Sequence, residues 1–471
     1  MGIQLDWQIE SEQKRRRATE DPQVKLMRRR QRRRLLAVLL GFGLGLCLII
    51  GAIVLRLRMV EDGLRQDLLD TVDAEVRALK IGDRDNYMNI RRSGSEYWMD
   101  LQRQTFDEYQ QLKNTGRLEL TGQVLDVEMD IDQSRARVVV EEKVNGIAYE
   151  VVWFYWHYTD AEQNGWRRVP PDINFWGEKT RLQRGQVQVN YYSLDETFAK
   201  AVGIRLSQWW GQVCAWLICP ADLPDLTVDI EPRSPADPTW DLYDDWKLVL
   251  ASPLYAGRSR LDNQLSPDIE QFMARLIAER VVNYSVSPST TFVASPYYDS
   301  DFFVNEYQAW LVGRMIGDPS QGSPFFESIV QNYGDTVPAL MLRVLNPDTS
   351  LGTLLQMTLP DMNIDTLQRI DWTSFFQWRL GLELKILRRT ELAISEDEML
   401  VRHNALYDDR DGTALQTAEY YRNQFSVYQP SWRVQSVTFI VDELGRLNAI
   451  VTADDVVAMF RWADVTWKRV S

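Results

Sequence analysis

The longest uninterrupted hydrophobic pattern in the chain runs from Leu35 to Leu55. Its 21 residues, LLAVLLGFGLGLCLIIGAIVL, carry no charge. A helix of this length rises about 31 Å, close to the thickness of the hydrocarbon layer of a bilayer. A signal peptide would have a shorter apolar core and a small-residue cleavage site, whereas this run is followed by Arg-Leu-Arg-Met. The pattern therefore predicts a transmembrane helix over residues 35–57 that anchors the chain.

Residues 60–182 change from a helical spacing to a strand-like one. Apolar residues recur at every third or fourth position over 60–79, which predicts an amphipathic helix, and residues 83–109 predict one or two more. After Gly116, apolar and polar residues alternate, and Asn145-Gly146 is typical of a hairpin turn. Strands are expected over 118–129, 136–140, 148–158 and from 165 onward. This order predicts helices followed by a curved antiparallel sheet.

Residues 387–471 repeat that order. Helices are expected over 396–407 and 413–425, and strands over 432–441, 447–452 and 456–467. The phrase Trp467-Lys468-Arg469-Val470 matches Trp166-Arg167-Arg168-Val169 in the first region. The similarity suggests two copies of one module.

Both modules resemble the nuclear transport factor 2-like fold, in which helices and a curved sheet form a cone. Such cones often hold a pocket, and some members of the family are enzymes that use an acid–base pair. The resemblance makes His157 a pocket candidate, together with its neighbours Trp156 and Tyr158. The alternative is that His157 is a packed or surface side chain in an aromatic strand.

Residues 183–386 separate the two modules and predict mainly helices. Two strands come first, Leu226–Glu231 and Trp246–Ala251, and Ser266-Pro267-Asp268 is typical of a helix start. Further helices are expected over 301–315, 325–333, 337–345, 351–359 and 365–384. The whole chain is thus expected to be a single-pass membrane protein with an α+β ectodomain. In it, a mainly helical domain lies between two cone modules, after a tail over residues 1–34.

The middle region resembles the gluzincin-type (peptidase MA-like) metallopeptidases. The residues that carry the resemblance are LIAERVVNY (276–284), DFFVNEYQAWLVGRM (301–315), YGDTVPALMLRVL (333–345) and SFFQWRLGLE (374–383). In that family one helix carries His-Glu-x-x-His and a second supplies a glutamate, so that two imidazoles and a carboxylate hold zinc. The resemblance places Glu279 at the general base and Glu306 at the third ligand.

Both zinc histidines are replaced in this chain, by Ala278 and Val282, and Tyr307 stands where the family usually has glycine. Neither alanine nor valine can bind a metal ion. The resemblance therefore implies a peptidase fold without catalysis, metal or other cofactor, in which Glu279 and Glu306 are vestigial. The alternative is that these two are ordinary carboxylates on helix faces.

Charge is distributed unequally on the two sides of the apolar run. Residues 1–34 carry eleven Lys or Arg and five Asp or Glu, which leaves 42 basic and 62 acidic residues, a net charge of −20, in the rest of the chain. The cations predict a cytoplasmic N-terminus and an ectodomain outside the plasma membrane. So acidic a chain is not expected to bind nucleic acid. Gly41 and Gly45 within the run favour a homodimer through close helix approach.

Cysteine is scarce. Cys47 lies in the apolar run, and Cys214 and Cys219 are close enough in sequence to form a disulfide outside the cell, with two buried thiols as the alternative.

These observations predict a membrane-anchored, non-catalytic binding or scaffold protein with a pseudo-peptidase domain, whose partner is an unidentified protein or small ligand. The alternatives are a hydrolase or isomerase that acts in a cone pocket, or a component that carries a signal from outside to inside.

Overall fold

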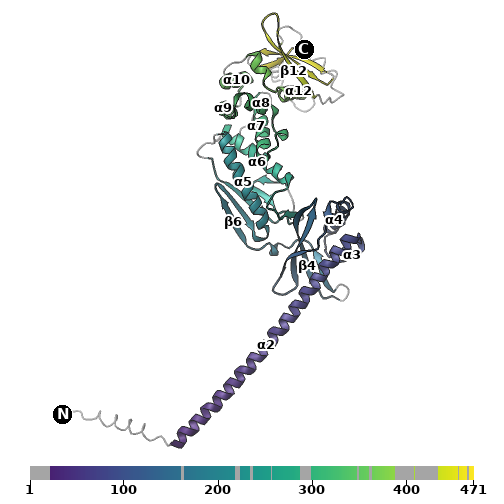
Figure 1. Ribbon diagram of the computed structural model, residues 1–471, viewed down its shortest axis with the longest axis vertical. Helices are drawn as coiled ribbons and strands as arrows, with labels where there is room; N and C mark the ends of the chain where they lie inside the picture. Colours follow the sequence, from purple (N-terminus) through teal and green to yellow (C-terminus); the bar gives the residue numbers. More distant parts are fainter. Residues whose placement is uncertain are drawn as a thin grey trace, which may run out of the picture. The chain divides into compact units, whose positions relative to one another are not determined.

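The computed structural model describes residues 22–160, 164–217, 223–233, 237–255, 257–286, 299–346, 349–359, 363–387, 408, 433–454, 456–463 and 466–470. The chain forms two compact units. Unit 1 comprises Met1–Val139 and Trp153–Pro170, and unit 2 comprises Val140–Val152 and Pro171–Ser471. Helices and antiparallel or mixed sheets make up the described part (Figure 1), so the α+β class is confirmed.

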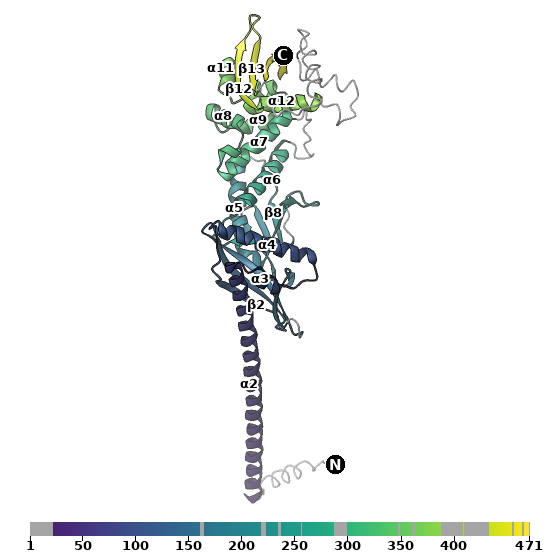
Figure 2. The ribbon, with the colours of Figure 1, turned by 90° about the vertical axis from the view of Figure 1, so that its right-hand side faces the viewer.

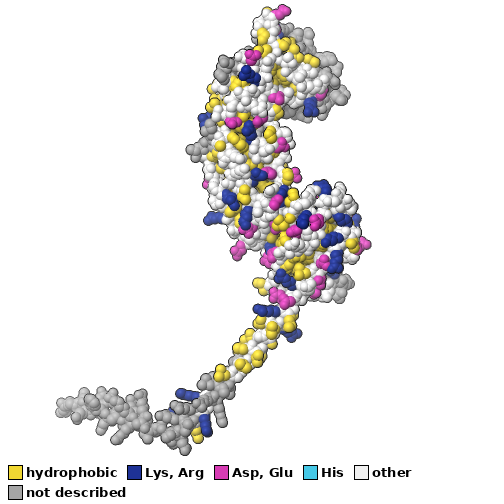
Figure 3. Space-filling view, viewed as in Figure 1, with side chains coloured by type: hydrophobic (Ala, Val, Ile, Leu, Met, Phe, Trp, Pro, Cys, Tyr) yellow, Lys and Arg dark blue, Asp and Glu magenta, His cyan; other side chains and the backbone are white. Residues whose placement is uncertain are grey.

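Unit 1 begins with the 60-residue helix α2 (Pro22–Ile81). The sequence predicted an apolar run and then a separate helical pattern, but the structure joins them into one unbroken helix (Figure 2). The described apolar part is long and apolar enough to cross a membrane, and none of its most hydrophobic window is buried by the rest of the chain. Figure 3 shows its apolar side chains uncovered ahead of the first folded part.

The C-terminal part of α2 packs into unit 1. Its buried face is formed by residues of the predicted amphipathic pattern, Leu68, Val72, Val76 and Leu79, and by Glu75, which that pattern did not include. Two further helices follow, α3 (Arg84–Asn89) and α4 (Glu96–Asn114). Each begins at a side-chain cap, because Asp83 accepts a hydrogen bond from the backbone N–H of Asn86 and Ser95 accepts one from Trp98.

The first sheet follows these helices. Its strands are β1 (Leu118–Glu119), β2 (Val124–Met129), β3 (Arg135–Val144), β4 (Ile147–Tyr158), β5 (Gly165–Val169) and β11 (Arg258–Arg260). The order is β1-β3-β4-β11, with β2 beside β3 and β5 beside β4. The predicted hairpin turn is confirmed, since Asn145 and Gly146 have φ of 53° and 80°. Residues 140–152 of this hairpin belong to unit 2, where β11 pairs with β4.

Unit 2 contains a mixed sheet that the sequence predicted only in part. Its strands are β6 (Lys179–Arg184), β7 (Val187–Tyr192), β8 (Leu226–Glu231), β9 (Thr239–Trp240) and β10 (Lys247–Ala251), in the order β6-β7-β8-β10-β9. Strands β7, β8 and β10 are parallel neighbours. Helix α5 (Glu196–Leu217) connects β7 to β8 and packs on β6 and β7. Gly203 permits this packing, because a Cβ there would lie 3.1 Å from Leu182 Cδ2. The short helices η1 (Ile173–Phe175) and η2 (Ser193–Asp195) lie in the loops before β6 and α5.

The helical part of unit 2 follows the mixed sheet. It contains α6 (Pro267–Val286), α7 (Asp299–Ile316), η3 (Pro319–Gln321), α8 (Pro324–Tyr333), α9 (Val337–Val344), α10 (Leu351–Thr358), α11 (Ile364–Gln368) and α12 (Thr373–Leu387). The single helix expected over 365–384 is wrong, because the chain stops at α11 and starts again at α12. Asp371 caps the second helix by accepting a hydrogen bond from Thr373 N, 3.0 Å away.

The last sheet is an antiparallel meander of β12 (Val434–Val441), β13 (Leu447–Ala453), β14 (Val456–Ala463) and β15 (Thr466–Arg469). The sequence predicted one strand over 456–467, but the chain turns back, so that Trp462 pairs with Trp467. The helices expected over 396–407 and 413–425 lie outside the described residues. Buried aromatic rings, among them Phe376, Phe460 and Trp467, join α12 to this sheet.

The repeated Trp-x-Arg-Val phrase has the same backbone environment in both sheets. Arg168 pairs with Tyr155 on the neighbouring strand, and Arg469 pairs with Phe460. The carbonyl of Arg168 accepts a hydrogen bond from Arg92 N, and that of Arg469 accepts one from Asp408 N, both at 2.9 Å. The sequence similarity therefore coincides with a structural one.

Candidate functional site

A buried ion cluster occupies the interior of unit 1. Its centre is Glu75 on α2, which has no exposed surface. Arg91 Nη2 donates to Glu75 Oε1 at 2.7 Å, Tyr155 Oη donates to Oε2 at 2.8 Å, and Arg168 also pairs with Oε1. Glu75 falls on the buried face of α2 because it lies one helical turn from Val72 and Leu79 and two turns from Leu68.

Two guanidinium groups share this single carboxylate. Arg91 also donates from Nε to Gln102 Oε1 at 3.0 Å, and its guanidinium lies over the ring of Tyr87. Arg168 lies over the ring of Trp153, 4.5 Å from the centroid. Delocalised guanidinium groups stack on aromatic rings in this way at low cost of desolvation.

The cluster is held in one protonation state at neutral pH. Burial alone would raise the pKa of Glu75, but the charges of Arg168 and Arg91 and the hydroxyl of Tyr155 lower it overall. Burial raises the pKa of Tyr155 well above its ordinary value, and the charge of Glu75 raises it further. A carboxylate that stays ionised and a phenol that stays protonated do not exchange protons near pH 7. The cluster therefore joins α2 to the sheet and does not supply an acid–base pair.

The predicted pocket residues of the first module do not converge. His157 stands edge-on to Trp166, with ring centroids 5.1 Å apart, on the face of β4 that also carries Tyr155. Trp156 and Tyr158 lie on the opposite face, where Arg135 and Arg92 lie over their rings. Buried side chains fill the interior that a pocket would need, namely Tyr87, Trp153, Tyr155 and Trp166.

The positions of the peptidase motif lie on α6 and α7. Ala278 and Val282 have no exposed surface and belong to the apolar core of unit 2, whereas Glu279 is exposed. Adjacent side chains on a helix point about 100° apart. Because Ala278 and Val282, at the first and fifth positions of the motif, are buried, Glu279 at the second position points outward. Among the described residues, no group of three or more His, Cys, Asp or Glu is arranged to hold a metal ion.

Glu306, the predicted third ligand, is bound within the protein. Ser323, which caps α8, donates to its Oε2, and Ser374 Oγ on α12 donates to the same oxygen at 3.2 Å. Burial raises the pKa of Glu306, the two hydroxyl groups lower it in part, and the charge of Asp371 raises it. Glu306 therefore joins three helices.

A second buried carboxyl group, Asp195, lies where the parallel strands of the mixed sheet end. Asp195 follows β7 and Ser252 follows β10, and these carboxyl ends meet at one edge. Trp176 Nε1 donates to Asp195 Oδ2 at 3.0 Å, and Ser252 Oγ donates to Oδ1. Burial raises the pKa of Asp195 to about 6, against a partial lowering by Ser252 and Trp176. The Trp176 indole and the Ser252 hydroxyl are both neutral, so neither contributes a charge that would lower the pKa of Asp195.

Replacing Asp195 by asparagine is expected to remove a pH dependence of unit 2. The folded-state pKa lies above the ordinary 3.8, so the folded protein holds this proton more tightly than the unfolded chain. Its contribution to the unfolding free energy is then fully present below about pH 4 and lost as pH rises through about 6. The rise in the pKa of Asp195 from 3.8 to about 6 corresponds to about 3 kcal/mol of unfolding free energy. Denaturant unfolding of the full chain between pH 4 and pH 7 measures this change.

The exposed neighbour Glu196 provides the control for this titration. Its Glu196→Gln variant should keep the wild-type pH profile, since this carboxylate pairs with Lys200 at the surface. If the unfolding free energies of wild type and Asp195→Asn changed in parallel with pH, the contribution assigned to Asp195 would be wrong.

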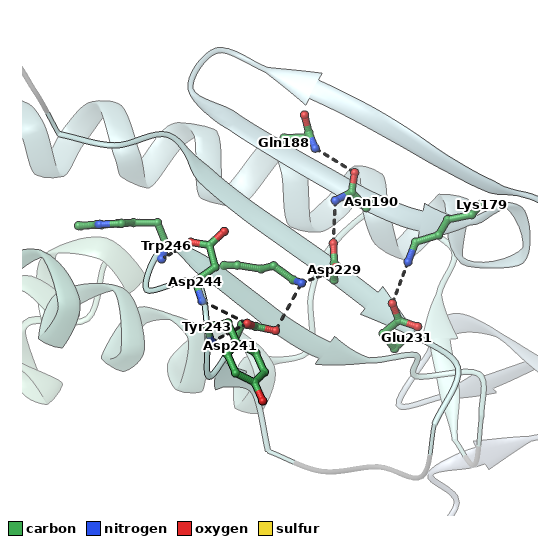
Figure 4. Close-up of polar contacts among 10 residues, drawn as sticks. Lys179, Gln188, Asn190, Asp229, Glu231, Asp241, Tyr243, Asp244 and Trp246 are labelled. Carbon is green, nitrogen blue, oxygen red and sulfur yellow. Dashed lines mark hydrogen bonds and ion pairs between the residues drawn. The ribbon is translucent and has the colours of Figure 1, made fainter.

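The outer face of the mixed sheet carries a connected polar network (Figure 4). Lys247 Nζ lies 3.3 Å from Asp229 Oδ2 and 3.4 Å from Asp241 Oδ2. Asn190 Nδ2 donates to Asp229 Oδ1 at 2.7 Å, and Gln188 donates to Asn190. Backbone N–H groups, first that of Tyr243, and the Lys247 ammonium lower the pKa of Asp241 despite slight desolvation. The network orders the loop before β10, where Asp241 accepts hydrogen bonds from the backbone N–H groups of Tyr243 and Asp244.

The predicted cysteine and glycine positions are only partly described. Cys214 is disulfide-bonded and Cys47 is a free, exposed thiol. Cys219 lies outside the described residues, so its pairing stays a prediction. A Cβ at Gly41 or Gly45 would meet nothing within 4 Å, which leaves this face of α2 open to another helix.

Sequence reasoning missed the buried carboxyl groups of Glu75 and Asp195. Glu75 had a visible signal, because it is a charged residue at a core position of an amphipathic pattern, between Val72 and Val76. A charge there implies a buried partner. Asp195 had no such signal, since β6, β7 and α5 were not assigned from the sequence.

Comparison with protein-family models, with curated proteins and with solved structures found no match for the chain, so the resemblances to gluzincin-type peptidases and to nuclear transport factor 2-like proteins stay predictions.

Proposed function

We propose that this chain is a membrane-anchored, non-catalytic binding or scaffold protein, with its N-terminus in the cytoplasm and its folded units outside the plasma membrane. One observation carries the proposal. Helix α2 runs without a break from the basic segment through the uncharged run to the buried face of unit 1. The eleven cations ahead of the run favour retention of the N-terminus inside.

The non-catalytic part of the proposal is supported by side-chain placement. The two positions that would supply imidazole ligands are apolar and packed, and the two vestigial glutamates do not face a common centre, since Glu279 is exposed and Glu306 binds two serines. A pseudo-peptidase that binds an unidentified protein or small ligand, without a cofactor, agrees with this arrangement.

Anchoring is tested by carbonate extraction of membranes that contain the full chain, with protease protection of an N-terminal tag. We expect the wild-type chain to stay in the membrane pellet. Ile49→Arg with Ile50→Arg should reduce that fraction, because each arginine at the centre of a span costs about 2.5–3.5 kcal/mol. Met59→Arg, beyond the run, is the control and should behave as wild type. A wild-type chain released by carbonate would contradict the proposal.

Catalysis is tested by metal analysis and peptide hydrolysis of the full chain purified in detergent with zinc. We expect substoichiometric zinc and the same background hydrolysis for the wild type and for Glu279→Gln. Stoichiometric zinc, with turnover that Glu279→Gln abolishes, would contradict a non-catalytic role.

A second candidate function is signalling from outside to inside. The observation that favours it is again the continuity of α2, because the ion pairs of Glu75 fix the helix to unit 1 and no break separates that point from the apolar run. Displacement of unit 1 would therefore be transmitted along the helix. Crosslinking through Cys47 that changes when a ligand is added would support this role.

A further inference from the structure

We propose that one end of unit 1 rests on the surface of the bilayer that α2 crosses. This end consists of the turn between β2 and β3 (residues 130–134) and the last residues of β4, Trp156 to Tyr158. The inference rests on the proposed function, since it requires α2 to be in a membrane.

A hydrogen bond fixes the height of this end along α2. Trp166 Nε1, at the start of β5, donates to the backbone carbonyl of Leu64 at 3.0 Å. Leu64 is nine residues beyond Leu55, where the uncharged run ends. At 1.5 Å per residue the bond therefore lies about 14 Å beyond the hydrocarbon layer.

Contacts farther along β5 give its direction. Arg168, two residues after Trp166, reaches Glu75, which is eleven residues after Leu64 on α2. Strand β5 and helix α2 therefore both lead away from the membrane. Gly165, the first residue of β5, therefore lies on the membrane side of Leu64.

The neighbouring strands place the other turn at the same end. His157 pairs with Trp166, and His157 N donates to the carbonyl of Ser134 at 2.8 Å, so β3 begins at this level. Strand β2 approaches from the opposite side. Gly122, just before β2, lies beside Val76, whose Cγ1 would be 3.3 Å from a Cβ there. The β2–β3 turn is thus directed back along α2 toward the span.

The distance between the β2–β3 turn and the lipid headgroups is short enough for side chains to span. The turn extends one or two residues beyond Ser134, which is about 3–7 Å. The headgroup layer occupies about 5–8 Å outside the hydrocarbon. A side chain at the tip of the turn therefore reaches the headgroups.

The exposed side chains at this end suit a membrane interface. Ile131, in the turn, is 100 % exposed, and Trp156 is 38 % exposed. Trp and Tyr are enriched where proteins meet lipid headgroups, and apolar tips insert there. Arg135 lies over Trp156 at 5.1 Å, and Arg92 lies over Tyr158 at 3.9 Å, which keeps two cations at the same surface. Guanidinium groups suit phosphate oxygens.

The turn is also held rigid in this position. Asp130 Oδ1 accepts hydrogen bonds from the backbone N–H of Ser134 at 2.8 Å and of Arg135 at 3.1 Å. The nearby Asp160 pairs with Arg92 at 2.9 Å. Since acids and cations are both present, the contact should depend on apolar and aromatic side chains more than on anionic lipid.

The experiment uses the full chain in phosphatidylcholine–phosphatidylglycerol nanodiscs, under non-reducing conditions that keep the disulfide of Cys214, with an environment-sensitive fluorophore on one introduced cysteine. The background is Cys47→Ser, and the probe is placed at Ile131→Cys. The matched control is Ile81→Cys, because Ile81 is 75 % exposed in the same unit. It lies 26 residues beyond Leu55, about 39 Å. Lipid spin-labelled near the top of the acyl chain quenches a probe that contacts the bilayer.

We expect quenching at position 131 to exceed that at position 81 by about threefold, with a blue-shifted emission. Equal quenching at the two positions would overturn the inference, and so would a blue shift at 131 without lipid quenching, which indicates contact with protein. A third probe, on native Cys47, tests the anchoring of α2 separately from the contact of unit 1 with the bilayer surface. If that probe is not quenched by lipid, the anchoring itself is wrong, whereas a quenched Cys47 with an unquenched position 131 overturns the surface contact alone.

Discussion

The Glu75→Gln variant is expected to lose about 3–5 kcal/mol of the stability of unit 1. The substitution keeps the size and shape of the side chain but removes its charge. Arg91 and Arg168 then remain in the interior without an anion, and Arg91 has no exposed side-chain surface from which water could solvate it. Leaving a buried charge uncompensated costs more than the intact pair contributes.

Hydrogen exchange of the full chain measures this loss locally, because the amides of β4 and β5 should exchange faster. Asp73→Asn is the matched control on the same helix, since Asp73 pairs with Arg77 at the surface and should give wild-type exchange. Glu75 has a lowered pKa, so its contribution is present above the ordinary carboxyl pKa and is lost as pH falls through the lowered one. The difference between wild type and Glu75→Gln should shrink over that acid range. Unchanged exchange at pH 7 would contradict the role given to the cluster.

The Arg379→Met variant is expected to lose a similar amount, about 3–5 kcal/mol, in unit 2. Arg379 on α12 is 2 % exposed, and its Nη1 lies 3.7 Å from Oδ1 of the buried Asp299. Its Nη2 donates to the carbonyl of Trp467 at 2.6 Å. Asp299 Oδ2 in turn accepts from Leu351 N and from Thr466 Oγ1. Removing the guanidinium leaves the buried carboxylate without its cation and a strand carbonyl without this donor.

Exchange of the amides of β12–β15 measures this effect, because the pair joins the last sheet to the helices. Arg280→Met is the matched control, since Arg280 pairs with the exposed Asp245 and should change little. Adding Asp299→Leu to Arg379→Met should restore part of the lost stability, because it removes the isolated charge. A single variant as stable as wild type would show that the pair does not hold the sheet.

Local patterns were predicted well because their physical causes are local. The hairpin at Asn145-Gly146 follows from backbone conformations that few other residue pairs adopt at low cost. The helix start at Ser266-Pro267-Asp268 is confirmed, because α6 begins at Pro267 and the Ser266 hydroxyl accepts a hydrogen bond from Ile269 N. The alternation over 226–231 predicted β8 because one face of that strand packs into the core.

Two errors of prediction come from short turns inside patterns that read as continuous elements, where residues only five apart come into contact. The break between α11 and α12 is fixed by Trp372, whose Nε1 donates to Leu367 O, in a stretch with continuous helical spacing. The turn between β14 and β15 appears once Trp462 pairs with Trp467. The spacing of apolar residues alone reveals neither the helix break nor the turn between the strands.

The sequence by itself determined the apolar run and the charge asymmetry around it, because membrane insertion depends on the composition of one continuous segment. It also determined that Ala278 and Val282 cannot bind a metal ion. Only the tertiary structure showed that Glu75 joins α2 to Arg91 and Arg168, and that the apolar run continues as one helix to that point. The reason is that an ion pair is a contact in space, and a carboxylate on a helix has no fixed partner until the chain has folded around it.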